Sequence, residues 1–241
     1  MKAKPMKPTL VLLPGLMCDA AVWAPQIQSL SDLVDFAVVD YGLRDSITAM
    51  AQLVLDSTAL ARFALAGHSM GGRVALEVMR LAPERVERMA LLDTGTHPLA
   101  DGEAGAKERA GRMALAQLAR DKGMRVMGQQ WLPGMVHPDV IGSALFESVL
   151  EMLERSSPAQ FSAQINALLT RPDAAPGLGD ITCPTLVLTG EQDVWSPPAQ
   201  HAAMAQVMVG AQLSIVPHSG HMSTLEQPEA VASAMRQWLL L

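Results

Sequence analysis

The sequence predicts an α/β fold with a mostly parallel sheet of about six strands, flanked by helices. Two observations predict this fold. Six short apolar runs are spread along the 241 residues, and stretches with apolar residues at helical spacing separate most of them. Strands that alternate with helices of about 10–15 residues are typical of parallel sheets built from right-handed crossovers.

The apolar runs are continuous rather than alternating, which is the pattern of strands buried on both faces of a sheet. They are Thr9–Leu13, Asp35–Val39, Phe63–Gly67, Met89–Asp93, Thr185–Thr189 and Leu213–Pro217. The helical stretches between and after them are Ala20–Leu30, Ile47–Leu60, Met70–Leu81, Pro197–Val207 and Leu225–Leu240.

The alternation of strands and helices is interrupted once, between the fourth and fifth apolar runs. About seventy residues there contain helical patterns such as "DVIGSALFESVLEMLER" and no convincing strand. We interpret residues 96–175 as a helical lid insertion, and residues 1–95 and 176–241 as the core. A second independent domain is a weaker interpretation, because the strands on both sides belong to one sheet.

The composition indicates a globular protein with a large core, since 49% of the residues are apolar and 17% are charged. A net charge of −6, with both signs interspersed, argues against nucleic acid or an anionic membrane as a partner. Two cysteines are too few for a disulfide framework and favour a reducing compartment.

The N-terminal segment superficially resembles a signal peptide, because Lys2, Lys4 and Lys7 precede the apolar run "TLVLLPGLMC". That run is short, and Pro14-Gly15 interrupts it, so a buried strand in a cytoplasmic protein is the better interpretation. No run is long enough to span a bilayer as a helix.

The segment "GHSMGG" places Ser69 between the apolar run Phe63–Gly67 and the helical stretch Met70–Leu81. A GxSxG pattern alone is weak evidence, because glycine is common. A strand-to-helix turn is the context in which such a serine becomes an exposed nucleophile. Glycines two positions before and after the serine allow the neighbouring backbone to pass, and the following helix directs its N–H groups at the site.

A serine nucleophile needs a base and a group that orients the base. His221 follows the last apolar run in "PHSGHMSTLEQP", and Asp193 follows the preceding one in "TGEQDVWSPP". Loops at the carboxyl ends of parallel strands converge on one crevice, so Ser69, Asp193 and His221 are expected to meet there. The competing candidates are His218 for the base, and Asp93 and Glu191 for the acid.

Four segments together resemble the α/β-hydrolase fold superfamily, in a small esterase-like form that lacks the N-terminal hairpin. They are "LVLLPGLMCDAAVW", "GHSMGG", "CPTLVLTGEQDVWSPP" and "SGHMSTLEQPEAV", in the order and spacing of that family. The resemblance implies a catalytic triad of Ser69, Asp193 and His221. It also implies an oxyanion hole formed by the backbone N–H groups of Met70 and Leu16, although Pro14 stands where many relatives have histidine.

The candidate pocket residues are Trp131, Met127, Met135, Trp195 and Met222, because flexible thioethers and aromatic rings suit an apolar pocket. Four arginines are candidates for binding a dicarboxylate, namely Arg73, Arg109, Arg112 and Arg125. Cys18 has no histidine placed as its base and is interpreted as a structural thiol. No pair of histidines has metal-ligand spacing, so neither a metal nor another cofactor is expected.

The sequence therefore predicts a serine hydrolase that cleaves a small, largely apolar carboxylic ester through an acyl-enzyme. Hydrolysis of a lactone or of a carbon–carbon bond on the same fold is the alternative, and a non-catalytic ligand-binding protein is a further one. The expected partner is a small-molecule substrate, and the chain is expected to be a monomer or homodimer.

Overall fold

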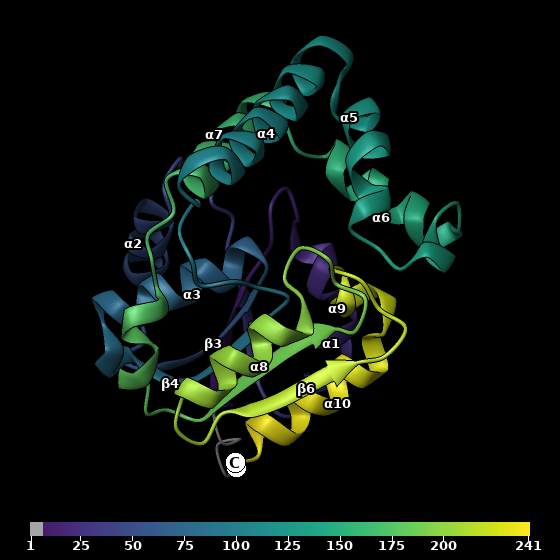
Figure 1. Cartoon of the computed structure of the whole chain (residues 1–241). Helices are drawn as coiled ribbons and strands as arrows, with labels where there is room; N and C mark the ends of the chain where they lie inside the picture. The colour runs from purple at the N-terminus through teal and green to yellow at the C-terminus, as the bar shows by residue number, and fades with distance from the viewer. Residues whose placement is uncertain (1–6) are drawn as a thin grey trace.

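The computed structural model describes residues 7–241, so Lys2 and Lys4 lie outside the described residues. Six strands form one parallel sheet in the order β2-β1-β3-β4-β5-β6, with helices on both faces (Figure 1). The strands are β1 (Thr9–Leu13), β2 (Asp35–Val38), β3 (Phe63–His68), β4 (Val86–Leu92), β5 (Thr185–Gly190) and β6 (Gln212–Val216). The predicted α/β fold class is confirmed, and each apolar run forms a strand.

The two edge strands differ from the sequence prediction, because they are not buried on both faces. Strands β1, β3, β4 and β5 are almost entirely buried, whereas every residue of β2 and all but one of β6 retain exposed surface. Leu213 and Ile215 of β6 are 42% and 45% exposed. An edge strand has a neighbour on one side only, so an apolar run does not by itself distinguish it from a central strand.

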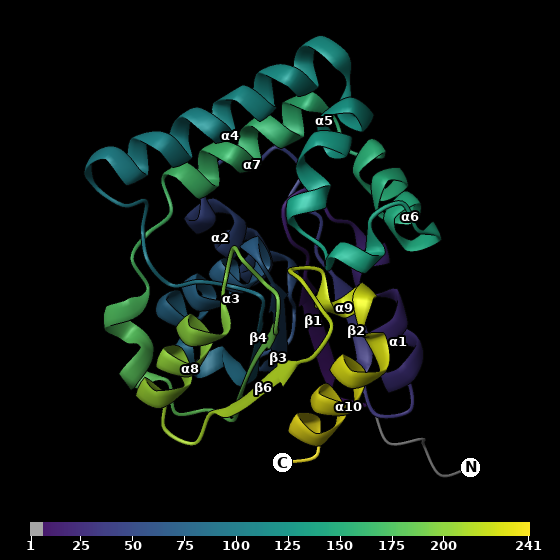
Figure 2. The same cartoon turned by 45° about the vertical axis from the view of Figure 1, so that its right-hand side comes forward.

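Helices from distant parts of the chain cover the two faces of the sheet (Figure 2). On one face α1 (Ala24–Leu30) packs against α10 (Pro228–Leu239), beside α9 (Ser223–Glu226). On the other face lie α2 (Ile47–Ser57), α3 (Met70–Leu81) and α8 (Pro198–Val207). In the described part of the chain, no helix is long and apolar enough to cross a membrane.

Two predicted helices are each divided in the structure. The stretch Ala20–Leu30 begins as the 3₁₀ helix η1 (Ala20–Trp23) and continues as α1, with Pro25 in its first turn. The stretch Leu225–Leu240 is divided between α9 and α10 at Pro228. Proline lacks a backbone N–H and is tolerated in the first turn of a helix, so in each case the new helix has a proline in its first turn.

Four α-helices connect β4 to β5 and lie over the carboxyl ends of the strands (Figures 1 and 2). They are α4 (Gly102–Lys122), α5 (Met124–Trp131), α6 (Ala144–Glu154) and α7 (Pro158–Leu169), and the chain returns to the sheet through η5 (Ala175–Asp180). Helix α4 packs on α5 and α7, and α5 packs on α6. The boundaries of a separate insertion, at residues 96 and 175, stay a prediction.

The turn from β3 to α3 brings three backbone segments unusually close together. A Cβ atom on Gly67 would lie 2.3 Å from the carbonyl oxygen of Gly71, and one on Gly71 would lie 2.0 Å from the carbonyl oxygen of Leu13. Both distances are far inside van der Waals contact, so only glycine lets α3 begin this close to the ends of β1 and β3. These two contacts fix the position of the turn residue between the glycines, Ser69.

We expect Gly71→Ala to lower the free energy of unfolding by about 2 kcal/mol or more, because the added methyl group forces α3 away from β1. Gly111 of α4 provides the matched control, since a Cβ there meets nothing within 4 Å. Gly111→Ala is expected to stabilise the protein by about 0.5–1 kcal/mol, the usual gain in a helix interior. Urea unfolding measures both changes, and equal stability of the two variants would contradict the packing argument.

Candidate active site

Ser69 occupies the turn between β3 and α3 in a strained backbone conformation. Its φ of 54° and ψ of −116° lie where residues other than glycine are rarely found. Two hydrogen bonds hold this conformation. The backbone N–H of Ser69 donates to the carbonyl of Leu92 (2.8 Å), and the Thr94 hydroxyl donates to the carbonyl of Ser69 (2.7 Å). Both partners lie at or just beyond the end of β4, so the neighbouring strand fixes the serine.

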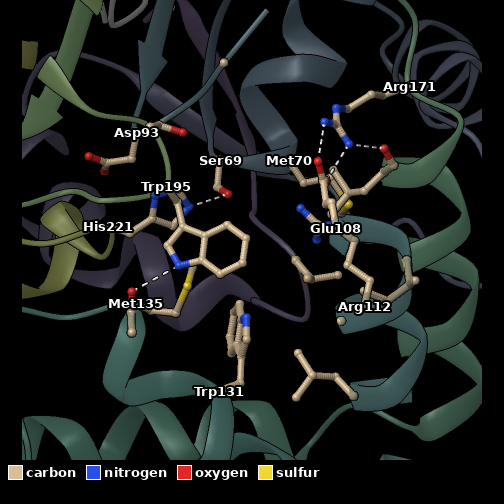
Figure 3. A pocket seen from close by; sticks show the side chains of 18 of the residues that line it. Ser69, Met70, Asp93, Glu108, Arg112, Trp131, Met135, Arg171, Trp195 and His221 are labelled. Atoms are coloured by element: carbon tan, nitrogen blue, oxygen red, sulfur yellow. Dashed lines mark hydrogen bonds and ion pairs between the residues drawn. The ribbon is translucent and has the colours of Figure 1, made fainter. Parts of the chain in front are cut away.

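A chain of hydrogen bonds links Ser69 to the two other residues that the sequence analysis grouped with it. The Nε2 atom of His221 lies 2.7 Å from Ser69 Oγ, and its Nδ1 atom lies 2.8 Å from Asp193 Oδ2. The remaining oxygen of Asp193 accepts hydrogen bonds from the backbone N–H groups of Trp195 (2.8 Å) and Ser196 (2.9 Å). Loops after β3, β5 and β6 thus bring the three side chains together, and Figure 3 shows Ser69 and His221 joined at the cavity.

The pKa values of His221 and Asp193 are shifted in opposite directions. Burial alone lowers the pKa of His221, but the charge and hydrogen bond of Asp193 outweigh it and raise that pKa above its usual value. For Asp193, burial raises the pKa, but His221 and the two backbone N–H donors outweigh burial. The pKa of Asp193 is therefore lowered below its usual value. The carboxylate is therefore ionised at neutral pH, and an imidazole held by it through Nδ1–H offers Nε2 as a proton acceptor.

Asp93, a competing candidate for the acid, lies at the end of β4 and is fully buried. Its carboxyl group contacts the backbone N–H of Gly190 (2.9 Å) and the hydroxyl of Ser223 (2.5 Å) rather than His221. Burial, and then the negative charge of Asp193, raise the pKa of Asp93 to about 8. Asp93 therefore ties β4, β5 and α9 together as a largely neutral group.

The other competing candidates lie away from the Ser69 side chain. Glu191 is exposed and accepts a hydrogen bond from the side chain of Gln192 (2.9 Å). His218 is also exposed, with its ring centroid 6.0 Å from that of His137. The structure places neither of them in contact with Ser69.

His68 is a site residue that the sequence analysis missed. Its ring is buried beside that of His221, and its Nε2 atom lies 2.8 Å from the His221 carbonyl oxygen. Burial, and then the nearby His221, lower the pKa of His68 to about 4, so the ring is neutral. Because a carbonyl only accepts, the neutral ring carries its proton on Nε2 and positions the backbone of His221.

The loop after β1 brings Leu16 beside the serine. Leu16, Met70 and Ser69 line the same cavity, and a Cβ on Gly15 would lie 3.3 Å from the Cβ of Ser69. The next residue, Met17, has a φ of 59°, and its backbone N–H donates to the side-chain oxygen of Gln164 at 2.7 Å. Gln164 lies on α7, so a helix 147 residues away holds this loop. The sequence analysis missed Gln164.

A cavity of about 780 Å³ opens beside Ser69 (Figure 3). Loops at the edge of the sheet form one side, and α4, α5 and α7 form the other. Of the five predicted pocket residues, Trp131, Met135 and Trp195 line the cavity. Met127 and Met222 do not, because the structure buries both in the core, with 0% and 2% of their surface exposed. Further apolar side chains line the cavity, namely Leu115, Phe161, Ile165 and Leu168.

Two of the four candidate arginines line the cavity and two do not. Arg73 and Arg112 line the cavity, together with Arg171, Lys107 and Glu108, which the sequence analysis did not select. Arg109 is exposed on α4, and Arg125 forms ion pairs with Glu147 and Glu154. Spacing along α4 does not separate Arg109 from Arg112, because the neighbours that α4 packs against decide which one faces the cavity.

Cys18 does not line this cavity and instead borders a second, separate pocket. Burial, and then the charge of Asp19, raise the pKa of the Cys18 thiol to about 12, so it stays protonated at neutral pH. Across residues 7–241, no three His, Cys, Asp or Glu side chains gather where they could hold a metal ion.

Comparison with known proteins identifies the family. Residues 10–234 match the model of the alpha/beta hydrolase family, which is almost the whole chain. The protein belongs to the alpha/beta hydrolase family. The family resemblance predicted from the four sequence segments is therefore confirmed.

Individual relatives of this hydrolase agree with that assignment. It is 29% identical to a pimeloyl-acyl-carrier-protein methyl ester esterase of Nitrosomonas europaea, over 94% of this chain and 93% of that protein. It is also 29% identical to an (E)-2-((N-methylformamido)methylene)succinate hydrolase of Acinetobacter baylyi, over 95% and 89%. An esterase structure from Thermogutta terrifontis, solved with malate bound, superposes with a TM-score of 0.84 at 26% identity, over 98% and 90%. These relatives support a hydrolase enzyme.

The geometry around His221 generates a testable prediction about the hydrolase. Replacing Asp193 by asparagine removes the charge that opposes the effect of burial, so we expect the pKa of His221 to fall in Asp193→Asn. NMR titration of the imidazole measures this shift. Glu191→Gln is the matched control, because it removes an exposed carboxylate from the same loop and is expected to leave the pKa of His221 in place. A His221 pKa that is equal in native protein and Asp193→Asn would contradict the described electrostatics.

Proposed function

We propose that this alpha/beta hydrolase cleaves a small, largely apolar carboxylic ester through an acyl-enzyme formed on Ser69. The observation that carries the proposal is the hydrogen-bonded chain from Asp193 through His221 to Ser69 at a mainly apolar cavity. A serine that is hydrogen-bonded to a histidine, which is in turn hydrogen-bonded to a carboxylate, is a recurrent arrangement in enzymes that transfer acyl groups.

In the proposed acylation, Ser69 Oγ attacks the substrate carbonyl carbon while His221 Nε2 takes the hydroxyl proton. Asp193 holds the ring through Nδ1–H and stabilises the imidazolium that forms. The oxyanion of the tetrahedral intermediate is stabilised by the backbone N–H groups of Met70 and Leu16, both of which lie at the cavity. The imidazolium then gives its proton to the leaving alkoxide as the carbon–oxygen bond breaks.

Deacylation repeats these steps with water as the nucleophile. His221 removes a proton from water, the hydroxide attacks the acyl carbon, and collapse of the intermediate releases the acid and restores the Ser69 hydroxyl. Helices α4, α5 and α7 cover the cavity opposite the sheet and serve as the lid in this proposal. Their apolar side chains exclude water from the bound acyl group and strengthen the polar interactions at Ser69.

An ester is favoured as the substrate because the Nitrosomonas europaea relative is named a methyl ester esterase. The apolar residues from α4, α5 and α7 suit an aliphatic group of moderate length. A lactone contains the same acyl–oxygen bond and would use the same residues in the same roles.

The proposed function is tested by hydrolysis of p-nitrophenyl esters of graded acyl length, with Ser69→Ala as the comparison. We expect turnover by the native hydrolase and a loss of about a thousandfold or more in kcat for the variant, because the residues of a triad act as a unit. A folded native protein that neither hydrolyses any ester nor is labelled at Ser69 by a fluorophosphonate would overturn the proposal and favour a ligand-binding protein. If the fluorophosphonate labels Ser69 but no ester is hydrolysed, the proposed nucleophile would stand and the proposed ester substrate would be wrong.

A second experiment separates the two buried carboxyl groups. Asp193→Asn is expected to lower kcat by about 10³–10⁴, since the imidazole loses the group that fixes its tautomer. Asp93→Asn substitutes an amide for a group that is already largely neutral, and we expect a change of less than about tenfold. Steady-state kinetics on one ester compares them. A larger loss in Asp93→Asn than in Asp193→Asn would assign the orienting role to Asp93.

A further inference from the structure

The cavity beside Ser69 carries a cluster of positive charge that the proposed ester hydrolysis does not use. Arg73 lies on α3, Arg112 on α4, and Arg171 just after α7, and all three line the cavity with one carboxylate partner, Glu108. Figure 3 shows Arg112, Glu108 and Arg171 on the side of the cavity opposite His221. We call Arg73, Arg112 and Arg171 the arginine cluster.

Arg171 is the structural member of the cluster. Its guanidinium group donates to both oxygens of Glu108, at 2.8 and 3.0 Å, and to the carbonyl groups of His97, Pro98 and Leu168 at 2.7–3.2 Å. These acceptors occupy each of its three nitrogens, so Arg171 ties the segment after β4 to the end of α7. Arg171 therefore has no guanidinium N–H group left to donate to a ligand.

Arg73 and Arg112 have donors to spare. Within the described residues, the hydrogen bonds of Arg112 use Nε alone, which donates to Glu108 at 2.8 Å. Those of Arg73, over the same part of the chain, use Nη1 alone, which donates to the carbonyl of His97 at 2.8 Å. The Arg112 guanidinium lies 5.6 Å from the centroid of the Trp195 ring, which fixes its orientation, and its side chain is only 15% exposed.

The charges of the cluster are not balanced by protein groups. Burial, and then the neighbouring Arg171 and Arg112, lower the pKa of Arg73 to about 9, so it is still charged at neutral pH but repelled by its neighbours. Arg112 and Arg171 both hydrogen-bond to the carboxylate of Glu108, whereas Arg73 donates to the carbonyl of His97 and has no carboxylate hydrogen-bond partner within the described residues. A partly buried cation without a counter-charge is costly, and an anionic ligand removes that cost.

We propose that Arg73 and Arg112 bind a carboxylate group of the substrate, separate from the ester that Ser69 attacks. The planar guanidinium fork matches a carboxylate in bidentate geometry. A chain of methylene groups between the two ends of the substrate would lie against the apolar lining from α4 and α7. The substrate class is thus the monoester of an aliphatic dicarboxylic acid. This inference narrows the substrate of the proposed ester hydrolysis and rests on that proposed function.

The test compares two esters of equal length, the p-nitrophenyl monoester of adipic acid and p-nitrophenyl hexanoate, with spontaneous hydrolysis subtracted. In the first, a carboxylate replaces the terminal methyl group of the second. We expect the native hydrolase to prefer the carboxylated ester by about tenfold or more in kcat/KM, the effect of one charge-assisted hydrogen bond. Equal or better hydrolysis of the hexanoate would overturn the inference and leave the proposed function standing.

Variants locate the source of the preference. Arg73→Gln and Arg112→Gln are each expected to reduce the ratio of kcat/KM between the two esters by about tenfold, mostly through KM. Arg73→Lys keeps the charge and is expected to retain part of the ratio. Arg109→Gln is the matched control, because Arg109 is exposed on the same helix as Arg112. An unchanged ratio in both glutamine variants would overturn the assignment, and thermal unfolding of each variant checks that it is folded.

Binding of free ligands tests the cluster without turnover. By calorimetry with Ser69→Ala, we expect adipate to bind more tightly than hexanoate, and Arg112→Gln in that background to remove the difference. Hexyl phosphate that binds more tightly than adipate would overturn the choice of a carboxylate in favour of a phosphate group. If neither ester is hydrolysed by the native protein but adipate binds through the arginines, the proposed ester hydrolysis fails and the anion site stands.

Discussion

The backbone crossing at the end of β3 is the constraint on which the rest of the site depends. Helix α3 begins so close to β1 and β3 that Gly67 and Gly71 have no room for a Cβ atom. This close approach requires the positive φ of Ser69, which is stabilised by hydrogen bonds to the carbonyl of Leu92 and from the hydroxyl of Thr94. The strain places Oγ above the carboxyl edge of the sheet, where the loops after β5 and β6 can reach it. The proposed nucleophile is therefore held by main-chain packing rather than by side-chain preference.

Two buried carboxyl groups stand close together at this edge, and their hydrogen-bond partners separate their pKa values. Asp193 faces His221 and two backbone N–H groups, which favour its charged form. Asp93 has one backbone N–H and one hydroxyl, and the charge of Asp193 opposes its ionisation. Two like charges in one dry site are unfavourable, so ionisation of one carboxyl group keeps the other largely neutral. The role proposed for Asp193 thus depends on its nearby hydrogen-bond donors more than on which strand carries the carboxyl group.

The parts of the fold and of the candidate site that could be predicted from the sequence are those whose signals are local. The strand, glycine and helix pattern around Ser69 spans a few residues, and His221 and Asp193 each follow a strand in a loop of recognisable composition. His68, Gln164 and Arg171 were missed because their partners are distant: His68 meets the backbone of His221 153 residues away, and Arg171 meets His97 74 residues away. The signal for His68 was its position beside the serine, which was read only as part of the glycine turn.

Residues of the helical segment were the hardest to assign, for a physical reason. Met127 and Trp131 lie four residues apart on α5, yet the core encloses the first and the second lines the cavity. Helical spacing shows which residues share a face, but not whether a partner helix or a cavity lies opposite that face. Only the packing of α5 on α4 and α6 decides this. The same limit applies to Arg109 and Arg112 on α4.

Helix α7 contacts both the loop beside Ser69 and the arginine cluster, so it links the proposed substrate-binding residues to the residues at the edge of the sheet. Gln164 of α7 holds the loop that carries Leu16, and Arg171, just after α7, holds Glu108 of α4 and the segment after β4. A movement of α7 relative to the sheet would therefore disturb the backbone beside Ser69 and the arginine cluster together. The proposed chemistry of Ser69, His221 and Asp193 is built on the carboxyl edge of the sheet, whereas the shape and charge of the cavity come largely from α4, α5 and α7. Changes of specificity can accumulate in those helices without altering the strained turn, provided that the contact between Gln164 and Met17 is kept.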